Sequence, residues 1–346
     1  MRFRLSFVHL KPSILVRYAE IRLLRSSRFF WLNVGKAFIL SALTGCMLRG
    51  LSGFAQFISA ERGLMLFMIS MGSTFLIGEN LSWFQAGYLG FIVFCGWSGV
   101  DAMNNIYDAN LDEKSDPFRA EYTKKLGTLG LLVAILFLIL AVSLGVATQI
   151  PLLTVFIVVG CLVGVLYSVP PFRLRQTVLK PLVNFSVGSV PVLIVASFFS
   201  VFSLQVWPLV FLIGITTAVN SLWEDLADYT SDLNNDSKTF LIVLGLRRGF
   251  FTTIILGYCL VPLMVLIGVM FNLSLLYYII FSLIVTFMSL RLVQNRTILL
   301  GKEGDNTEQT LKLGKILAKD FVVLAIVQTT NIMLSGFLKY HVGFLF

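Results

Sequence analysis

Acidic residues gather in two short windows of a chain that is otherwise poor in charge. Ten of the 18 Asp and Glu residues fall within 101–116 and 224–236. In the first window Asn104, Asp108 and Asp112 follow one another at intervals of four, which places three side-chain oxygens along one face of a helix. Carboxylates stacked in this way repel one another unless a cation lies between them, so the window predicts a cation site.

The second window repeats this arrangement. Asp225, Asp228 and Asp232 are separated by three and four residues, which again places carboxylates on one side of a helix. Each window follows a long apolar run, and an acid at the membrane costs about 2.5–3.5 kcal/mol on insertion scales. Mg²⁺ fits both windows, because it prefers hard oxygen ligands and commonly bridges carboxylates to phosphate oxygens. The alternative is a pair of solvated acidic loops without a ligand.

Apolar runs position these windows and recur along the whole chain. Hydrophobic residues make up 57% of the sequence and charged residues 13%, whereas soluble domains are about 45–50% apolar. Most runs approach the roughly 20 residues that a helix needs to cross a bilayer, and no alternating pattern indicates a barrel. The sequence therefore predicts an all-α integral membrane protein. The runs are Phe30–Met47, Leu64–Ile77, Ala86–Gly99, Leu129–Ala147, Leu152–Tyr167, Leu182–Phe202, Val206–Trp223, Phe250–Phe271, Leu275–Leu290 and Phe321–Phe337.

Basic residues indicate the orientation of the chain. Of the 27 Lys and Arg residues, 23 lie in five segments, whereas the connections near 148–151, 203–205 and 272–274 contain none. By the positive-inside rule the five segments face the cytoplasm, and both acidic windows with them. The net charge of +9 thus reflects membrane orientation and not nucleic-acid binding. The segments are 1–30, 109–126, 172–180, 238–248 and 291–319.

Parity constrains the number of crossings. Three apolar runs precede the basic loop at 109–126, yet this loop and the N-terminus share a side only if an even number of helices separates them. We expect about nine crossings, with ten as the alternative. The run at 64–77 is the one expected to fall short of a full crossing, because it is short and bounded by Glu61, Arg62 and Glu79.

Two regions are expected. Residues 1–28 carry all seven Lys and Arg residues of the first 30 positions and lack the apolar core of a cleavable signal peptide, so they predict a cytoplasmic interfacial segment. Residues 29–346 form a single transmembrane domain. Four cysteines scattered through apolar runs and two distant histidines offer no paired metal-ligand spacing.

Three ordered motifs resemble the signatures of the UbiA superfamily of intramembrane prenyltransferases. The family's first signature, N-D-x-x-D-x-x-x-D, is matched at 104–112 in all but its second position. Its second, D-x-x-D-x-x-x-D ending near K-T, is matched at 225–239, and residues 167–175 look like its Y-S-x-P-P-x-R-L-K stretch, with Arg175 in the last position. The resemblance implies about nine transmembrane helices around a central, lipid-opening cavity.

The resemblance also implies roles for individual residues. It assigns Mg²⁺ to Asn104, Asp108, Asp112, Asp225, Asp228 and Asp232, with Asp108, Asp112, Asp228 and Asp232 as the catalytic set. It assigns diphosphate contacts to Arg119, Tyr167, Ser168, Arg173 and Lys238. Arg173 and Arg175 have an alternative role as topology signals. Asn105, Glu224 and Asp236 depart from the family pattern and alter its charge, which leaves the number of bound metals open.

The function that follows is Mg²⁺-dependent transfer of a prenyl group from an isoprenoid diphosphate to a lipophilic acceptor, such as an aromatic quinone or pigment precursor. One alternative is a membrane terpene cyclase on the same scaffold. Another is a transporter or lipid-binding protein with an acidic cation site. The expected partners are a prenyl diphosphate, the acceptor and membrane lipid, in the cell inner membrane or its equivalent, with the active-site loops in the cytoplasm.

Overall fold

The computed structural model describes residues 49–78, 82–111, 113, 116–234, 237–300 and 307–342. Two compact units are distinguished, Met1–Phe54 and Ala55–Phe346. Within the described part of the second unit every regular element is a helix, which confirms the predicted all-α class. The predicted boundary after residue 28, the apolar run at 30–47 and the window residue Asp112 lie outside the described residues.

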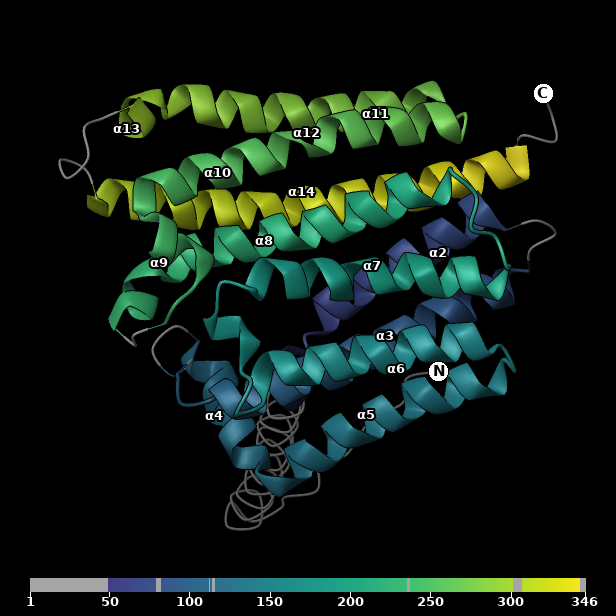
Figure 1. Cartoon of the computed structure of the whole chain (residues 1–346), viewed down its shortest axis with the longest axis horizontal. Coiled ribbons are helices and arrows are strands. Elements are labelled where there is room, and N and C mark those ends of the chain that lie inside the picture. The colour runs from purple at the N-terminus through teal and green to yellow at the C-terminus, as the bar shows by residue number, and fades with distance from the viewer. Residues whose placement is uncertain are drawn as a thin grey trace, which may run out of the picture. The chain divides into compact units, whose positions relative to one another are not determined.

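The long helices lie side by side and run alternately in opposite directions (Figure 1). Their bounds are α2 (Ala60–Ile77), α3 (Trp83–Asp108), α4 (Pro117–Leu126), α5 (Thr128–Ala147), α6 (Pro151–Ser168), α7 (Lys180–Phe198) and α8 (Val206–Asn234). A 3₁₀ turn, η1 (Leu174–Gln176), lies between α6 and α7. The chain continues through α9 (Phe240–Leu244), α10 (Leu246–Tyr258), α11 (Leu260–Met270), α12 (Leu275–Gln294), α13 (Arg296–Leu300) and α14 (Thr307–Val342).

Nine stretches of the described residues are long and apolar enough to cross a membrane. They are α2, α3, α5, α6, α7, the part of α8 up to Thr230, α10 with α11, α12, and most of α14. The count agrees with the prediction of about nine transmembrane helices.

The prediction that the run at 64–77 falls short of a full crossing was wrong. Helix α2 has 18 residues and is itself one of the nine candidate spans. The apolar run of the sequence begins at Leu64 because Glu61 and Arg62 interrupt its hydrophobicity, but the helix starts a turn earlier, at Ala60. Both charged residues line an internal cavity, so they belong to the helix and do not mark its end.

Six helices close a ring. Helix α2 packs against α3, α7 and α14, so the first and last described spans are neighbours. The ring continues through contacts of α3 with α6, of α6 with α7, of α7 with α8, and of α8 with α14. Helix α5 covers α3 and α6 from outside, and α10 and α11 pack on α8 while α12 packs on α14. The ring encloses a space that is lined in part by the C-terminal ends of α3 and α8.

Small residues bring α7 and α8 close together. A Cβ atom added at Gly188 would lie 2.0 Å from Thr217 Oγ1, and one added at Gly214 would lie 2.4 Å from Ser189 Oγ. Close helix approach through small residues is common in membranes, where packing and hydrogen bonds replace the hydrophobic driving force. Thr217 also donates to Asn184 O at 2.8 Å across the same interface. This seam fixes the register between the two helices.

Gly188→Ala is therefore expected to destabilise the fold. The added methyl group would overlap Thr217, and overpacking of this kind costs about 1–3 kcal/mol. Gly87→Ala is the matched control, because that glycine is also helical but has nothing within 4 Å of the added Cβ. Thermal unfolding in detergent should show a lower midpoint for Gly188→Ala than for the unaltered protein, and no decrease in the midpoint for Gly87→Ala. Equal midpoints for the two variants would contradict close packing at this seam.

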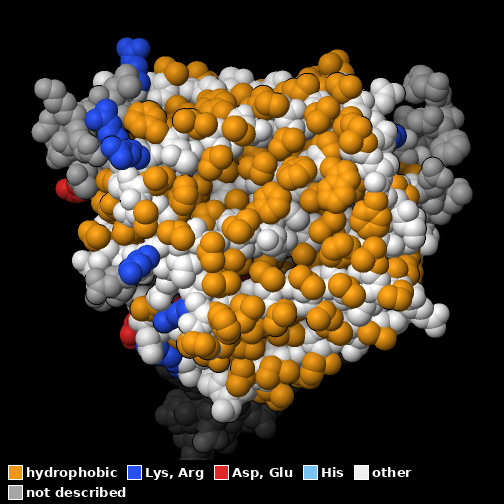
Figure 2. Space-filling view, viewed as in Figure 1, with side chains coloured by type: hydrophobic (Ala, Val, Ile, Leu, Met, Phe, Trp, Pro, Cys, Tyr) orange, Lys and Arg blue, Asp and Glu red, His pale blue; other side chains and the backbone are white. Residues whose placement is uncertain are grey.

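The outer surface is that of an integral multi-pass membrane protein. Exposed apolar side chains such as Leu129, Leu136 and Ile139 on α5 face outward. Figure 2 shows hydrophobic side chains covering the broad face, while Lys and Arg of the described residues gather mainly at the edge where α4, α9 and α13 lie. The bilayer thus meets the middle of the helices, and the charged groups collect at one end.

Candidate active site

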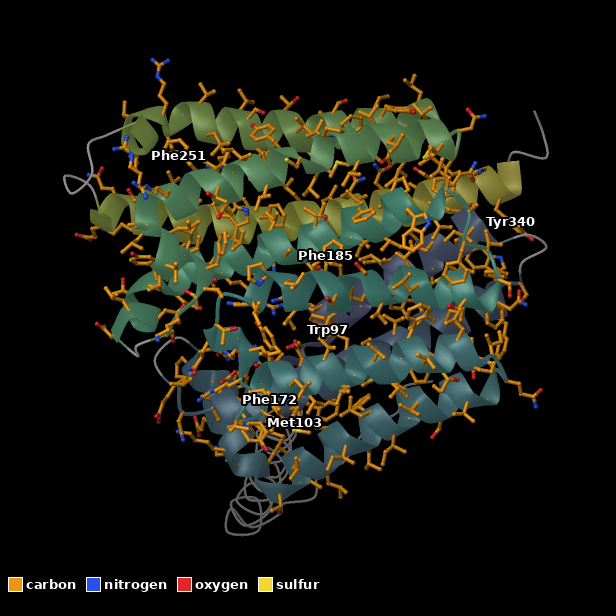
Figure 3. The ribbon with its side chains drawn as sticks, viewed as in Figure 1. Trp97, Met103, Phe172, Phe185, Phe251 and Tyr340 are labelled. Carbon is orange, nitrogen blue, oxygen red and sulfur yellow. The ribbon has the colours of Figure 1, made fainter. Side chains whose placement is uncertain are left out.

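A polar cavity lies inside the helix ring. Its empty volume, open parts included, is about 1420 Å³. Helix α3 contributes Asp101 and Asn104, and helix α8 contributes Glu224 and Asp228, so both acidic windows reach the same space. Trp97, labelled in Figure 3, lines the cavity from α3. Its remaining polar lining is Glu61, Arg62, Arg119, Tyr167, Arg175, Lys180, Asn184, Thr216, Thr217 and Asn220.

The first window is tied to the segment between α6 and α7. Asp108 is fully buried, and its Oδ1 accepts from Arg173 Nη2 at 3.0 Å while Arg175 forms a second ion pair with it. One turn earlier, Asn104 Oδ1 accepts from Ser168 Oγ at 2.8 Å and from Arg175 at 3.5 Å. The two matched motifs, distant in sequence, thus form one hydrogen-bonded unit.

The second window is paired with basic residues from other helices. Asp225 Oδ1 accepts a hydrogen bond from Lys180 Nζ, and both side chains are almost completely buried. Glu224 Oε1 pairs with Arg62 Nη2 at 2.7 Å and accepts from Asn220 Nδ2 at 3.1 Å. These contacts join α8 to α7 and to α2. Asp228 lines the cavity itself.

Arg175 lies between the two windows. It contacts Asn104 and Asp108 of the first. Burial lowers the pKa of Arg175, and the nearby charges of Asp232 and Asp228 in the second window oppose that shift. Burial also raises the pKa of Asp232, against the effect of Lys180 and with that of Asp228. One guanidinium group therefore interacts electrostatically with both acidic helix ends.

The donors at the second window fit a hard divalent cation. Asp228 lines the cavity with a carboxylate, and Asn220, which lines it two turns earlier in the same helix, has a buried Oδ1 without a hydrogen-bond partner. Eight residues span about 12 Å along a helix, so the two oxygens are separate donors and not ligands of one ion. Carboxylate and amide oxygens are the ligands that Mg²⁺ prefers. Among the described residues no group of three His, Cys, Asp or Glu is arranged to hold a metal. A cation here would thus take its remaining ligands from other oxygens, such as those of water or of a phosphate.

The predicted site residues divide into groups by their position. Asn104, Arg119, Tyr167 and Asp228 line the cavity. Ser168 donates to Asn104, and Asp108 pairs with both Arg173 and Arg175. Asp225 is covered by Lys180, and Asp232 is partly buried near the end of α8. Lys238 has an exposed side chain that does not line the cavity, although its backbone N–H donates to Gln176 O at 3.0 Å.

Two departures from the family pattern are explained by the structure. The Asn105 side chain is buried and donates to Phe57 O at 2.8 Å, so it anchors the backbone before α2 and does not face the cavity. Glu224 adds a negative charge, but Arg62 neutralises it. Asp236 lies outside the described residues. Asn105 is thus directed away from the cavity, and the charge that Glu224 adds is paired with Arg62.

Arg62, Lys180, Asn184 and Asn220 are lining residues that the motifs did not identify. A signal for the first two was present, because a basic residue inside or at the start of an apolar run is costly unless it faces a polar cavity. Lys180 is followed by Pro181 at the start of α7, a position typical of a helix N-terminus. Asn184 and Asn220 had no comparable signal.

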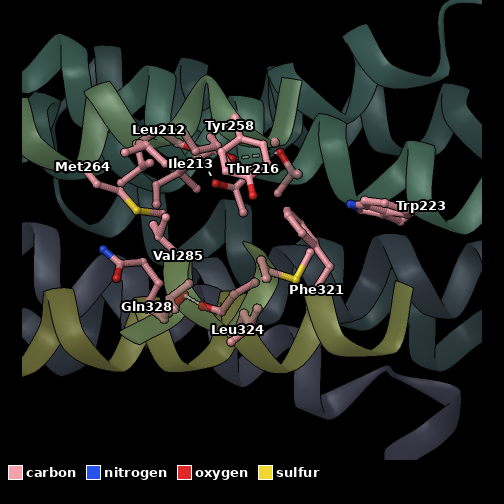
Figure 4. Close-up of a pocket in the computed structure, with 18 of the residues that line it drawn as sticks. Leu212, Ile213, Thr216, Trp223, Tyr258, Met264, Val285, Phe321, Leu324 and Gln328 are labelled. Atoms are coloured by element: carbon pink, nitrogen blue, oxygen red, sulfur yellow. Dashed lines mark hydrogen bonds between the residues drawn. The ribbon is translucent and has the colours of Figure 1, made fainter. Parts of the chain in front are cut away.

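An apolar chamber adjoins the polar cavity. Its empty volume, open parts included, is about 930 Å³, and its walls come mainly from α8, α10, α11, α12 and α14 (Figure 4). Met65, Thr216, Thr217 and Ala325 line both spaces. Leu212, Met264, Val285 and Phe321 are among the side chains of the chamber. A molecule with a charged head and a long apolar tail would find suitable surroundings for both parts.

Comparison with known proteins identifies similar sequences and folds. Residues 65–299, more than half of the chain, match the sequence profile of the UbiA prenyltransferase family. The chain is 30% identical over 218 residues to a probable homogentisate phytyltransferase 2, chloroplastic, from Oryza sativa subsp. japonica. The match covers 54% of this chain and 53% of that protein, so the chain spans about half the length of its curated relative.

Solved structures share the fold. A UbiA homologue from Archaeoglobus fulgidus bound to DMAPP and Mg²⁺ superposes with a TM-score of 0.58 at 15% identity, over 84% of this chain and 99% of that one. A digeranylgeranylglyceryl phosphate synthase superposes with a TM-score of 0.57, also at 15% identity, over 83% of this chain and 98% of that one. The helical arrangement is therefore common to these proteins.

Proposed function

Because the chain belongs to the UbiA prenyltransferase family, we propose that it transfers a prenyl group from an isoprenoid diphosphate to a lipophilic acceptor, with Mg²⁺ as cofactor. The observation that carries the proposal is the pair of adjoining spaces, one polar and charged, the other apolar. A prenyl diphosphate has matching parts. The diphosphate would lie in the polar cavity and the hydrocarbon tail in the apolar chamber.

The basic side chains would receive the diphosphate. Arg119 of α4 and Arg175 of η1 line the polar cavity, and Arg173 contacts Asp108. Preorganised cations at the position where charge develops stabilise a departing anion. Tyr167 and Trp97 offer aromatic faces in the same space, and such faces attract cations. The allylic cation left after departure of diphosphate would be shielded there from water.

The acidic side chains would hold the cofactor. Asn104, Asp108 and Asp112 are the proposed ligands at the first window, with Asp228 and Asp232 at the second. The role of Asp225 depends on its contact with Lys180. Mg²⁺, when bound, supplies electrostatic stabilisation of the diphosphate leaving group. Arg173 and Arg175 would have to turn from Asp108 toward the diphosphate, and their side chains, 27% and 23% exposed, leave room for this movement.

The acceptor is proposed to be an aromatic, lipid-soluble compound. The similarity to a protein named as a homogentisate phytyltransferase favours this class. We further propose that the cavity opens to the cytoplasm, because Lys and Arg collect at the end of the bundle that carries both acidic windows.

The test is turnover by the purified protein. Labelled prenyl diphosphates of several lengths are incubated with Mg²⁺ and a panel of aromatic acceptors, and products are identified by mass. Release of diphosphate that requires both acceptor and Mg²⁺ is expected. A cyclic product without acceptor would indicate a terpene cyclase instead. Cation flux in vesicles without diphosphate release would indicate a transporter.

A further inference from the structure

The contact between Lys180 and Asp225 differs from the other ion pairs of the site. Its side chains are 9% and 0% exposed, whereas those of Arg62 and Glu224 are 39% and 29% exposed. Lys180 lines the polar cavity but Asp225 does not. The ammonium group therefore stands between the carboxylate and the space in which a substrate would bind.

The fold holds this pair in a fixed position. Lys180 is the first residue of α7, and Asp225 lies in α8. The two helices run in opposite directions and touch at Gly188 and Thr217. Lys180 lies eight residues before Gly188, and Asp225 lies eight residues after Thr217, so both are carried the same distance from this contact toward the same end of the bundle.

A bound metal at Asp225 would conflict with this arrangement. A divalent cation at the carboxylate would face the ammonium of Lys180 in a buried setting, where like charges repel more strongly than in water. The pair of Asp108 with Arg173 and Arg175 is less restricted, because those arginines come from the connection between α6 and α7 and are about a quarter exposed. Lys180 has no comparable freedom.

We propose that Lys180 is a diphosphate-binding residue and that Asp225 is its positioning residue, not a metal ligand. An ammonium group has three donors, of which the recorded contact with Asp225 uses one. The remaining donors are available to phosphate oxygens in the cavity, next to Tyr167 and Arg175. This inference rests on the proposed function, since it assigns residues to the anion and metal subsites of the same cavity.

The test separates metal binding from anion binding. Mn²⁺ affinity is measured by electron paramagnetic resonance on the purified protein, without anion, for Asp225→Asn and Asp228→Asn. These variants make the same chemical change three residues apart on one helix. Asp225→Asn is expected to keep Mn²⁺ affinity within about twofold, and Asp228→Asn to lower it tenfold or more. An equal loss in both variants would make Asp225 a metal ligand and overturn the proposal.

Anion binding is measured with inorganic pyrophosphate in the presence of Mg²⁺. Lys180→Met is expected to weaken pyrophosphate binding tenfold or more, and Lys180→Arg to restore most of it, whereas Mn²⁺ affinity without anion does not fall in either. Unchanged pyrophosphate affinity in Lys180→Met would overturn the proposal.

Removing one partner of a buried ion pair leaves an uncompensated charge, which typically destabilises the fold by about 3–5 kcal/mol. The double variant Lys180→Met with Asp225→Asn leaves no uncompensated charge. It provides a second measurement should either single variant fail to fold. It is expected to bind Mn²⁺ like the unaltered protein and pyrophosphate weakly. Loss of Mn²⁺ binding in it contradicts the proposal. If the unaltered protein binds neither Mn²⁺ nor pyrophosphate, the proposed function fails as well. If it binds both ligands but the variants do not show the expected affinities, this inference alone fails.

Discussion

Asp228→Asn is expected to slow prenyl transfer by about 10²-fold or more, the loss typical of removing one strong electrostatic contact from an active site. Asp228 lines the polar cavity from α8, whereas Asp225, one turn earlier, is covered by Lys180. The change keeps the shape of the side chain and removes its charge. Steady-state diphosphate release at a series of Mg²⁺ concentrations should show a lower kcat and a higher Mg²⁺ requirement.

Glu121→Gln provides the control for the loss of one carboxylate. Glu121 is exposed on α4 and pairs with Lys125 at 2.7 Å, one turn along the same helix. Exposed pairs of this kind contribute little to stability, so stability and turnover should both persist. If Asp228→Asn retained full turnover and an unchanged Mg²⁺ requirement, the second window would have no part in the reaction.

Much of the fold could be predicted from the sequence because membrane helices satisfy their backbone hydrogen bonds locally. Length and hydropathy alone therefore predicted most of the spans and their number. The start of α2 was missed for a related reason. Glu61 and Arg62 are costly in lipid and read as the end of an apolar run, but both face an internal cavity. A hydropathy pattern does not distinguish a residue in lipid from one in a polar interior.

The acidic windows were visible because helical spacing is a local property. Their counter-ions were not, because each comes from a different helix. Arg62 pairs with Glu224 across 162 residues of sequence, and Lys180 with Asp225 across 45. Which basic residue meets which acid depends on helix packing and register. Gly188 and Thr217 determine that register, and no charge pattern encodes it.

These pairings change the electrostatic description of the site. Read from the sequence, the windows are two clusters of like charge that require metal ions. In the structure Asp108, Glu224 and Asp225 are already neutralised by basic side chains. Among the described residues Asp228 forms no ion pair, and its side chain lines the cavity. The basic side chains of the chain thus supply part of the positive charge that balances the acidic windows, so metal ions need not supply all of it.

Arg175 is the basic residue whose loss should have the largest effect. It contacts Asn104 and Asp108, lines the cavity and interacts electrostatically with Asp228 and Asp232. Arg175→Met removes a guanidinium group that links the two windows, and leaves Asp108 with Arg173. We expect kcat/KM for the prenyl diphosphate to fall by about 10²-fold or more. Arg175→Lys should recover only part, because an ammonium lacks the planar, bidentate geometry of guanidinium.

A topology signal is the competing role for Arg175, and it predicts a different result. If the residue acted only through the positive-inside rule, any basic residue on the same side of the membrane would be equivalent. Arg248 is the matched control, because it is exposed near the start of α10 at the same end of the bundle. Arg248→Met removes the same charge and should leave kcat/KM for the inserted, purified protein unchanged. Equal kinetics for Arg175→Met and Arg248→Met, with reduced membrane insertion of both, would make Arg175 a topology signal and remove it from the site.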